Sequence, residues 1–234
     1  PNVNKAHGVV SRALLMEGPY VQVVGALEGY RNSNAPIAFL DRDGVINLGR
    51  PGYVNTASQM QLLDGAASSI ARLKQAGYAV CVVTNQSAIS RGLWGPKRLI
   101  ELHQALQTQL SEHDPHAVID LFITCPHRYE DRCSCRKPSP AMLLLGHRLI
   151  REEMELETSW EPVQIPVSFP SVAWWSEKPP APHVLDAMVG DRRSDMGAGW
   201  GYGARLFRVP RTLGLATVID RIIQEEDEGD AFQP

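Results

Sequence analysis

Short apolar runs bounded by turn residues alternate along the chain with longer segments in which apolar residues recur at helical spacing. This alternation is typical of a parallel β-sheet covered by helices. The apolar runs predict strands at residues 37–41, 79–84, 118–124, 186–190 and 204–209. The periodic segments predict helices at residues 65–77, 96–113, 139–153, 193–200 and 215–225. The pattern therefore predicts an α/β fold with a mainly parallel sheet.

Three segments lie outside this alternation. Residues 1–35 form an N-terminal extension of unknown role with one strand-like stretch, YVQVVGAL. Residues 154–183 hold six prolines and three tryptophans, and proline at this density excludes helix interior and central strand. We expect a surface insertion with its tryptophans folded onto the body, with a substrate lid or a partner surface as the alternative. The acidic tail 226–234 is predicted to be flexible, which leaves residues 36–225 as the main domain.

The length of 234 residues fits one α/β domain with appendages, or two small domains. The hydrophobic fraction of 44%, the charged fraction of 21% and the net charge of −3 are ordinary for a globular protein. No apolar run reaches the length of a membrane span, and the start at Pro1 lacks the order of a signal peptide, although an upstream piece could have been removed. We expect a cytoplasmic monomer that does not bind a membrane. We also expect no nucleic-acid partner, because Lys and Arg are scattered and not clustered on one surface.

Polar side chains directly follow three of the predicted strands. Asp41 and Asp43 come after the first, Thr84 and Asn85 after the second, and Asp191 after the fourth. In a doubly wound sheet these strand ends form one edge, where ligands bind. Carboxylates gathered there repel one another. Mg²⁺ resolves this repulsion, because it takes oxygen ligands from one or two carboxylates and completes its shell with water and a substrate phosphate. A magnesium site for phosphoryl chemistry is therefore predicted.

The spacing of Asp41 and Asp43 allows a division of roles. One carboxylate can attack phosphorus and form an aspartyl-phosphate, while the other protonates the leaving oxygen and then deprotonates water. The motif D-x-D-G alone is explained equally well by a turn after a strand. Joined to VVTNQ and VGDxxxD in this order, each at a strand end, it favours catalysis.

These motifs resemble those of the haloacid dehalogenase superfamily of phosphotransferases. FLDRDGVIN resembles the first motif, VVTNQS the second, CRKPSP the third and MVGDRRSDM the fourth, over about residues 36–210. The resemblance implies the fold of that superfamily, a Rossmann-like three-layer sandwich without a large cap domain and with a short zinc-binding loop. It makes Asp41 the nucleophile and Asp43 the general acid and base. It implies that Thr84 and Lys137 hold the phosphoryl oxygens. Magnesium would bind the carboxylates of Asp41 and Asp191 and the backbone carbonyl of Asp43.

Two positions depart from this pattern or leave it open. Val45 stands where the superfamily commonly has threonine, a variation that leaves the mechanism intact. Asp195, the second acid of the fourth motif, is either a magnesium ligand through water or an acid in the first turn of a helix, and we favour the helix role.

The stretch CPHRYEDRCSCRKP, which begins with the loop 125–135, packs three of the four cysteines and one histidine together. In an intracellular chain such a cluster is more often a metal site than a disulfide framework, and three thiolates with one imidazole satisfy tetrahedral zinc. The spacing is tighter than in most zinc fingers, so reactive or incidental cysteines are an alternative. A closed site of this kind would be structural and would aim Arg136 and Lys137 at the phosphate. The predicted zinc ligands are Cys125, His127, Cys133 and Cys135.

Other potential ligands lack such partners in the sequence. Cys81 lies in an apolar strand and is expected to be a small core residue. We expect the following histidines to be surface or packing residues: His103, His113, His116, His147 and His183.

The cysteine loop and TNQSAISRG narrow the resemblance to the zinc-containing branch of heptose-bisphosphate and histidinol-phosphate phosphatases. TNQSAISRG is similar to the heptose type, although Ala88 stands where that type tends to have glycine. The resemblance implies substrate contacts from Asn85, Ser87, Arg91 and Arg136. The two arginines would bind a second phosphate, which guanidinium groups hold bidentately. A solvated Arg91 is the alternative.

This resemblance implies a magnesium-dependent phosphatase that acts on a sugar bisphosphate, with Mg²⁺ and Zn²⁺ as cofactors. Foremost we expect removal of the 7-phosphate from D-glycero-D-manno-heptose 1,7-bisphosphate, although the insertion could alter the sugar accepted. Histidinol phosphate or another small phosphomonoester is the alternative substrate. An alternative of another class is a zinc-stabilised interaction module without turnover, which the complete set of acid and lysine positions disfavours.

Overall fold

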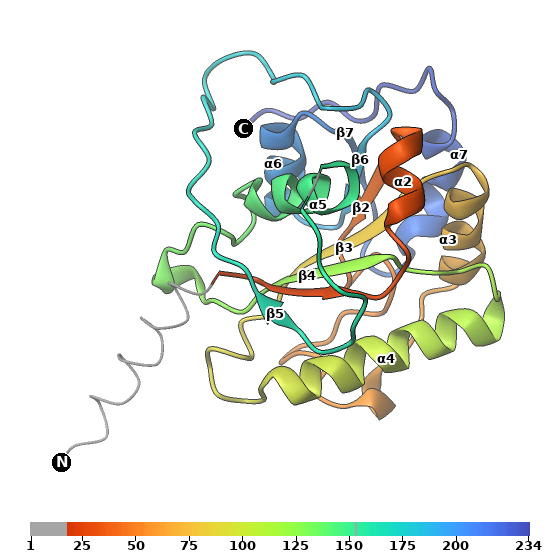
Figure 1. Cartoon of the computed structure of the whole chain (residues 1–234), viewed down its shortest axis with the longest axis vertical. Coiled ribbons are helices and arrows are strands. Elements are labelled where there is room, and N and C mark those ends of the chain that lie inside the picture. Colours follow the sequence, from red (N-terminus) through yellow and green to blue (C-terminus); the bar gives the residue numbers. More distant parts are fainter. Residues whose placement is uncertain (1–17, 153) are drawn as a thin grey trace.

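The computed structural model describes residues 18–152 and 154–234, and these form one seven-stranded sheet with the order β5-β1-β4-β3-β2-β6-β7 (Figure 1). Strands β2, β3, β4, β6 and β7 run parallel, whereas β1 pairs antiparallel with β4 and with β5. The prediction of a mainly parallel sheet is therefore confirmed. The strands span Tyr20–Val23 (β1), Ile37–Leu40 (β2), Ala79–Asn85 (β3), Leu121–Cys125 (β4), Val163–Gln164 (β5), Ala187–Gly190 (β6) and Arg205–Arg208 (β7).

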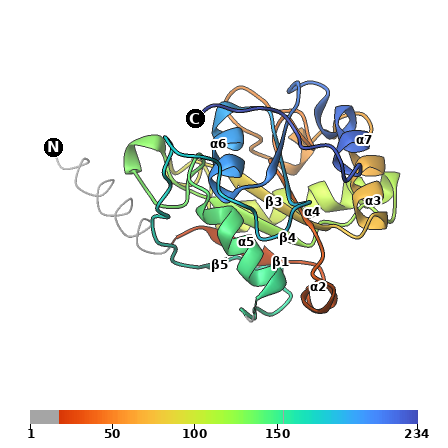
Figure 2. The same ribbon diagram turned by 90° about the horizontal axis from the view of Figure 1, so that it is seen from above.

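Helices cover both faces of the sheet. They span Glu28–Ser33 (α2), Ala66–Gln75 (α3), Pro96–His113 (α4), Ala141–Arg151 (α5), Arg193–Tyr202 (α6) and Ile219–Ile222 (α7). Short 3-10 helices span Ala57–Gln59 (η1), Tyr129–Asp131 (η2) and Gly214–Thr217 (η3). Figure 2 shows α5 on one side of the strands and α3 and α7 on the other.

The core lies in two layers because successive strand residues point to opposite faces. Leu40 and Val82 pack with apolar residues of α3, α4 and α7. Phe39 and Ile123 pack on the other face with residues of α5 and α6. The central strands are buried on both faces and are therefore apolar at nearly every position.

Two predicted elements differ from the structure. The strand predicted at 118–124 begins only at Leu121, because the Val118 N–H bonds back to the His116 carbonyl in a turn. The helix predicted at 215–225 is divided into η3 and α7. Val218 between them has φ −127°, which is outside the helical range.

The peripheral segments are joined to this core. Residues 18–35 supply β1 and α2, a helix that the sequence pattern did not predict, while residues 1–17 lie outside the described part of the chain. The tail is anchored, since Arg221 pairs with Asp227 and Asp230 at 2.8 Å each. No helix in the described ranges is long and apolar enough to cross a membrane.

The insertion 154–183 runs along the outside of the fold (Figure 1). It adds the short strand β5 to the sheet edge. The Trp174 ring stacks on Trp200 of α6 with 5.6 Å between ring centroids, whereas Trp175 is 87% exposed. Two of its tryptophans thus lie on the body, because Trp160 also packs near Phe122.

Candidate active site

A cavity of about 690 Å³ opens at the carboxyl ends of the central strands. The loop after β2, the end of β3, the segment after the cysteine loop and the start of α6 all contribute to its wall. Sequence reasoning had singled out nine of its lining residues: Asp41, Asp43, Thr84, Asn85, Ser87, Arg91, Arg136, Lys137 and Asp195. No described residue of the insertion 154–183 lines it, which weakens the lid alternative.

Three carboxylates meet at the floor of this cavity, where Asp41 and Asp195 line it and Asp191 lies next to them outside the lining. Asp41, Asp191 and Asp195 each offer an oxygen, and these oxygens lie within 4.8 Å of one another. The loop approaches closely because residue 44 is glycine: it has φ +87°, and a Cβ there would lie 2.9 Å from Asp191 Cγ. The Asp191 Oδ1 atom is buried and accepts no hydrogen bond from the described residues. A buried acceptor without a donor, beside further carboxylates, fits Mg²⁺.

Lys137 supplies the positive charge at this floor. Its Nζ lies 3.0 Å from Asp41 Oδ1 and 2.7 Å from Asp195 Oδ1. It also donates to the Val83 carbonyl at 2.7 Å. Burial opposes the charge, but the carboxylates of Asp195 and Asp41 outweigh burial and raise the pKa of Lys137. The ammonium group is therefore held charged, at a position where it can contact a phosphoryl oxygen bound next to Asp41.

For the Asp41 carboxyl, burial outweighs the nearby opposite charge. Burial raises its pKa to about 6, against the attraction of Lys137, and the neighbouring carboxylates of Asp195 and Asp43 add to the rise. Burial, followed by the charge of Asp41, also raises the pKa of Asp191. A cation between these groups would reverse both shifts, because it stabilises the ionised forms.

Asn85 joins the second and third motifs. Its Nδ2 donates to the Lys137 carbonyl at 3.3 Å, and its Oδ1 accepts from the Lys137 N–H at 3.2 Å. This reciprocal pair fixes the backbone of Lys137 at the end of β3. In the described structure Asn85 thus orients the lysine as well as lining the cavity.

Asp195 takes the helix role that the sequence favoured. Its Oδ2 accepts the Arg192 N–H at 2.9 Å at the start of α6, which is the helix-start role. Its Oδ1 faces Lys137 within the carboxylate group.

Asp43 is held by side chains that sequence reasoning did not assign. Arg42 donates to its Oδ2 at 2.9 Å, Asn47 to its Oδ1 at 2.8 Å and Gln86 to its Oδ2 at 2.9 Å. Burial would raise the pKa of Asp43, but Arg42 and these hydrogen bonds outweigh it and hold the pKa below its usual range. Arg42 and Gln86 sit inside the first and second motifs, so motif position was the signal that could have found them.

Arginines and tyrosines also line the cavity. Tyr53, with φ +76°, places its hydroxyl 2.9 Å from Ser87 Oγ and 3.1 Å from Arg91 Nε. The arginines and tyrosines of the lining that the sequence did not predict are Arg50, Tyr53, Tyr129, Arg192 and Arg211. With Arg91 and Arg136, five guanidinium groups therefore line a cavity that also holds Lys137.

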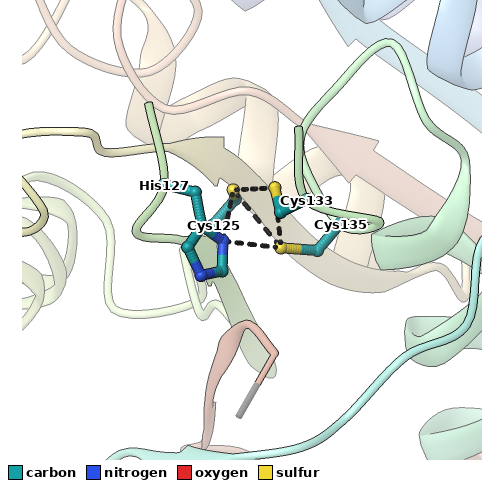
Figure 3. A group of neighbouring side chains, drawn as sticks. All are labelled: Cys125, His127, Cys133 and Cys135. Carbon is teal, nitrogen blue, oxygen red and sulfur yellow. Dashed lines mark hydrogen bonds between the residues drawn. The ribbon is translucent and has the colours of Figure 1, made fainter. Parts of the chain in front are cut away.

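The predicted zinc ligands form one cluster (Figure 3). The three Sγ atoms are separated by 3.4 to 3.7 Å, and His127 Nδ1 lies 3.2 Å from Cys135 Sγ and 3.6 Å from Cys125 Sγ. Zinc–sulfur bonds of about 2.3 Å in a tetrahedron place sulfurs about 3.8 Å apart. All four cysteines of the chain are free thiols, so the cluster fits a four-ligand zinc site and is not a disulfide.

This cluster is coupled to the cavity through Arg136. The Arg136 N–H points at Cys133 Sγ at 3.4 Å, and its Nη1 donates to the His127 carbonyl at 2.8 Å. Ordering of the four-ligand group thus sets the direction of a cavity-lining arginine.

Residues that were expected to play no part in the site lie mostly elsewhere. Cys81 is buried in β3 as a core residue. His103 is fully buried on α4, stacked on Phe122 at 4.2 Å, and none of the five histidines lines the cavity.

Solved structures of haloacid-dehalogenase-like phosphatases share this fold. A putative HAD-like phosphatase from Mesorhizobium loti has the same fold, with a TM-score of 0.62 and 22% identity over 92% of this chain and 96% of that one. The D,D-heptose 1,7-bisphosphate phosphatase of B. bronchiseptica, solved with magnesium and phosphate, matches with a TM-score of 0.60 and 25% identity over 81% of this chain and 99% of that one.

Relatives found by sequence similarity narrow the superfamily to one family. D-glycero-beta-D-manno-heptose-1,7-bisphosphate 7-phosphatase of Haemophilus influenzae is 30% identical over 180 residues, 74% of this chain and 80% of that protein. The chain belongs to this family. The enzyme of the same name from Photorhabdus laumondii is 37% identical over 126 residues, 51% of this chain, and the alignment spans only 65% of that protein. No model of a protein family matches the chain.

Proposed function

We propose that the protein is a magnesium-dependent phosphatase that removes the 7-phosphate from D-glycero-D-manno-heptose 1,7-bisphosphate. The observation that carries the proposal is the convergence of Asp41, Asp191 and Lys137 at a cavity that arginines also line. The carboxylates would hold Mg²⁺, which neutralises charge on the transferring phosphoryl group. The arginines match a second phosphate on the same substrate. The names of the relatives, and the magnesium and phosphate in the related crystal structure, support the same choice.

In the proposed reaction the Asp41 carboxylate attacks phosphorus and becomes an aspartyl-phosphate. Lys137 and Thr84, both lining the cavity next to Asp41, hold the phosphoryl oxygens. Because its pKa is low, Asp43 first takes up a proton from solvent; it gives this proton to the leaving sugar oxygen and then takes one from the water that hydrolyses the intermediate. Arg91 and Arg136 hold the second phosphate, while Asn85 and Ser87 complete the substrate contacts.

Zinc is proposed as a structural ion on Cys125, His127, Cys133 and Cys135. A closed set of four ligands leaves no position for chemistry. Its role would be to order the segment that carries Arg136 and Lys137. We further propose, as expected from the sequence, that the enzyme acts as a monomer.

Phosphate release from a panel of phosphomonoesters tests this function. The panel holds both anomers of the heptose bisphosphate, histidinol phosphate and an oligonucleotide 3′-phosphate, each with and without magnesium. We expect magnesium-stimulated release from the bisphosphate, faster from the beta anomer that the relatives' names specify. Faster release from histidinol phosphate would favour the second substrate class. No release from any substrate would favour an interaction module.

A further inference from the structure

A buried arginine supports Asp43 from behind the cavity. Arg42 is 0% exposed and is absent from the cavity wall. Its Nε and Nη2 both face Asp43, with Nε at 3.2 Å from Oδ1 and Nη2 at 2.9 Å from Oδ2. The two nitrogens therefore donate to the two carboxylate oxygens in the bidentate geometry that only an arginine offers.

The remaining nitrogen of the guanidinium reaches a histidine. Arg42 Nη1 lies 3.5 Å from His103 Nε2 on α4, and His103 Nδ1 lies 2.6 Å from Gln22 Oε1 on β1. Gln22 Nε2 in turn donates to the Trp160 carbonyl at 2.8 Å. An amide oxygen only accepts, so His103 carries its proton on Nδ1 and presents the lone pair of Nε2 to Arg42.

Stability alone is a poor explanation for this arrangement. A buried ion pair often contributes no more to stability than well-packed apolar residues of the same volume. The arrangement does, however, fix the direction of one carboxylate, and displacement of a reacting group by about 1 Å can lower a rate by about 100-fold. Three separate elements, β1, the loop after β2 and α4, contribute to fixing this one side chain.

We propose that Arg42 is a positioning residue for Asp43, and that His103 and Gln22 hold its guanidinium in the orientation that aims the Asp43 carboxylate at the leaving oxygen. The proposal rests on the proposed function, in which Asp43 is the general acid. It predicts that disturbing His103 harms proton delivery to the leaving group while leaving the attack by Asp41 intact.

His103→Phe tests the proposal, because phenylalanine keeps the stack on Phe122 and removes both ring nitrogens. kcat/KM is measured on two substrates. The sugar bisphosphate leaves as an alkoxide, which needs a proton from the enzyme, whereas p-nitrophenyl phosphate leaves as a phenolate, which does not. We expect a loss of about 10- to 100-fold on the sugar and less than about threefold on p-nitrophenyl phosphate. His103→Gln, whose amide oxygen can accept from Arg42, should recover most of the loss. Equal losses on both substrates would overturn the proposal.

His147 offers a matched control. Its Nδ1 lies 3.2 Å from Arg151 Nη1, and Arg151 grips Asp186, so the same three residue types meet away from the cavity. His147→Phe should leave the ratio of the two kcat/KM values unchanged. If His103→Phe fails to fold, Gln22→Leu takes its place, because it removes the acceptor of the His103 Nδ1 proton. It should also lower kcat/KM on the sugar bisphosphate relative to kcat/KM on p-nitrophenyl phosphate.

A measurement without turnover separates the two proposals. If the wild-type protein hydrolyses neither substrate, the proposed function fails, and nuclear magnetic resonance decides the positioning claim. We expect resolved, slowly exchanging Nη protons for Arg42, assigned by their loss in Arg42→Lys, and faster exchange in His103→Phe. Unchanged Arg42 signals in His103→Phe would overturn the positioning role.

Discussion

Lys137 Nζ lies 3.0 Å from Asp41 Oδ1, and both side chains are buried. Lys137 also pairs with Asp195, and Arg192 Nε lies 3.9 Å from Asp191, so two cations meet three carboxylates at this point. The floor of the cavity therefore keeps an excess of negative charge. Burial, with the carboxylates of Asp195 and Asp43, raises the pKa of Asp41 to about 6 despite the lysine.

The raised pKa of Asp41 has a consequence for stability. The folded state keeps the Asp41 proton up to about pH 6, whereas an unfolded aspartate releases it near pH 4. Stability from this group therefore falls as pH rises through that window. In magnesium-free buffer, Asp41→Asn should become more stable relative to wild type between pH 4 and 6, by an amount on the order of 2 kcal/mol. Urea unfolding at several pH values measures the difference, and a constant difference would contradict this balance.

Gly44→Ala should impair magnesium binding. The new Cβ would lie 2.9 Å from Asp191 Cγ and would displace that carboxylate. We expect the magnesium concentration for half-maximal activity to rise about 10-fold or more. Gly77→Ala is the matched control, since Gly77 has φ +85° with open space around its Cβ position and lies away from the cavity. An equal rise in the required magnesium concentration in both variants would show that backbone strain alone, and not displacement of Asp191, explains the effect.

Cys133→Ser should lower zinc content and stability together, because binding of a structural metal contributes to the free energy of folding. Elemental analysis should show about one zinc ion per wild-type chain and much less in the variant, with a melting temperature lower by about 5 °C or more. Cys81→Ala removes a buried thiol outside the cluster and should keep the zinc. Unchanged zinc content in Cys133→Ser would reject the assignment.

Arg91→Ala should discriminate between substrates with one and two phosphates. Loss of a guanidinium contact to a phosphate is expected to lower kcat/KM for the bisphosphate by about 10- to 100-fold. The corresponding monophosphate should be affected much less. Arg98→Ala, which removes an arginine paired with Glu101 on α4 outside the cavity, is the control. Equal losses on both substrates would remove Arg91 from the second-phosphate role.

The sequence predicted the parallel core because apolar runs at β2, β3 and β6 are local signals. The ends of those strands also located Asp41, Thr84 and Asp191, since parallel strands bring their carboxyl ends to one edge. The cysteine cluster was equally local, with its four ligands inside eleven residues.

What the sequence did not predict depends on long-range packing. Gln22 and His103 are 81 residues apart, and they meet because β1 pairs with β4 while His103 of α4 stacks on Phe122 of β4. Arg50 and Arg211 gave no signal either, because the loops that carry them have no periodicity. The anchored tail escaped prediction since its acidic composition also suits a solvated end.

Reductive trapping of the aspartyl-phosphate tests the central claim most directly. Borohydride reduces an acyl phosphate on aspartate to homoserine, which mass spectrometry of the proteolysed protein locates. During turnover with magnesium we predict homoserine at position 41, and none there in Asp41→Asn or in protein without substrate. Homoserine at another aspartate, or none at all while phosphate is being released, would contradict the account.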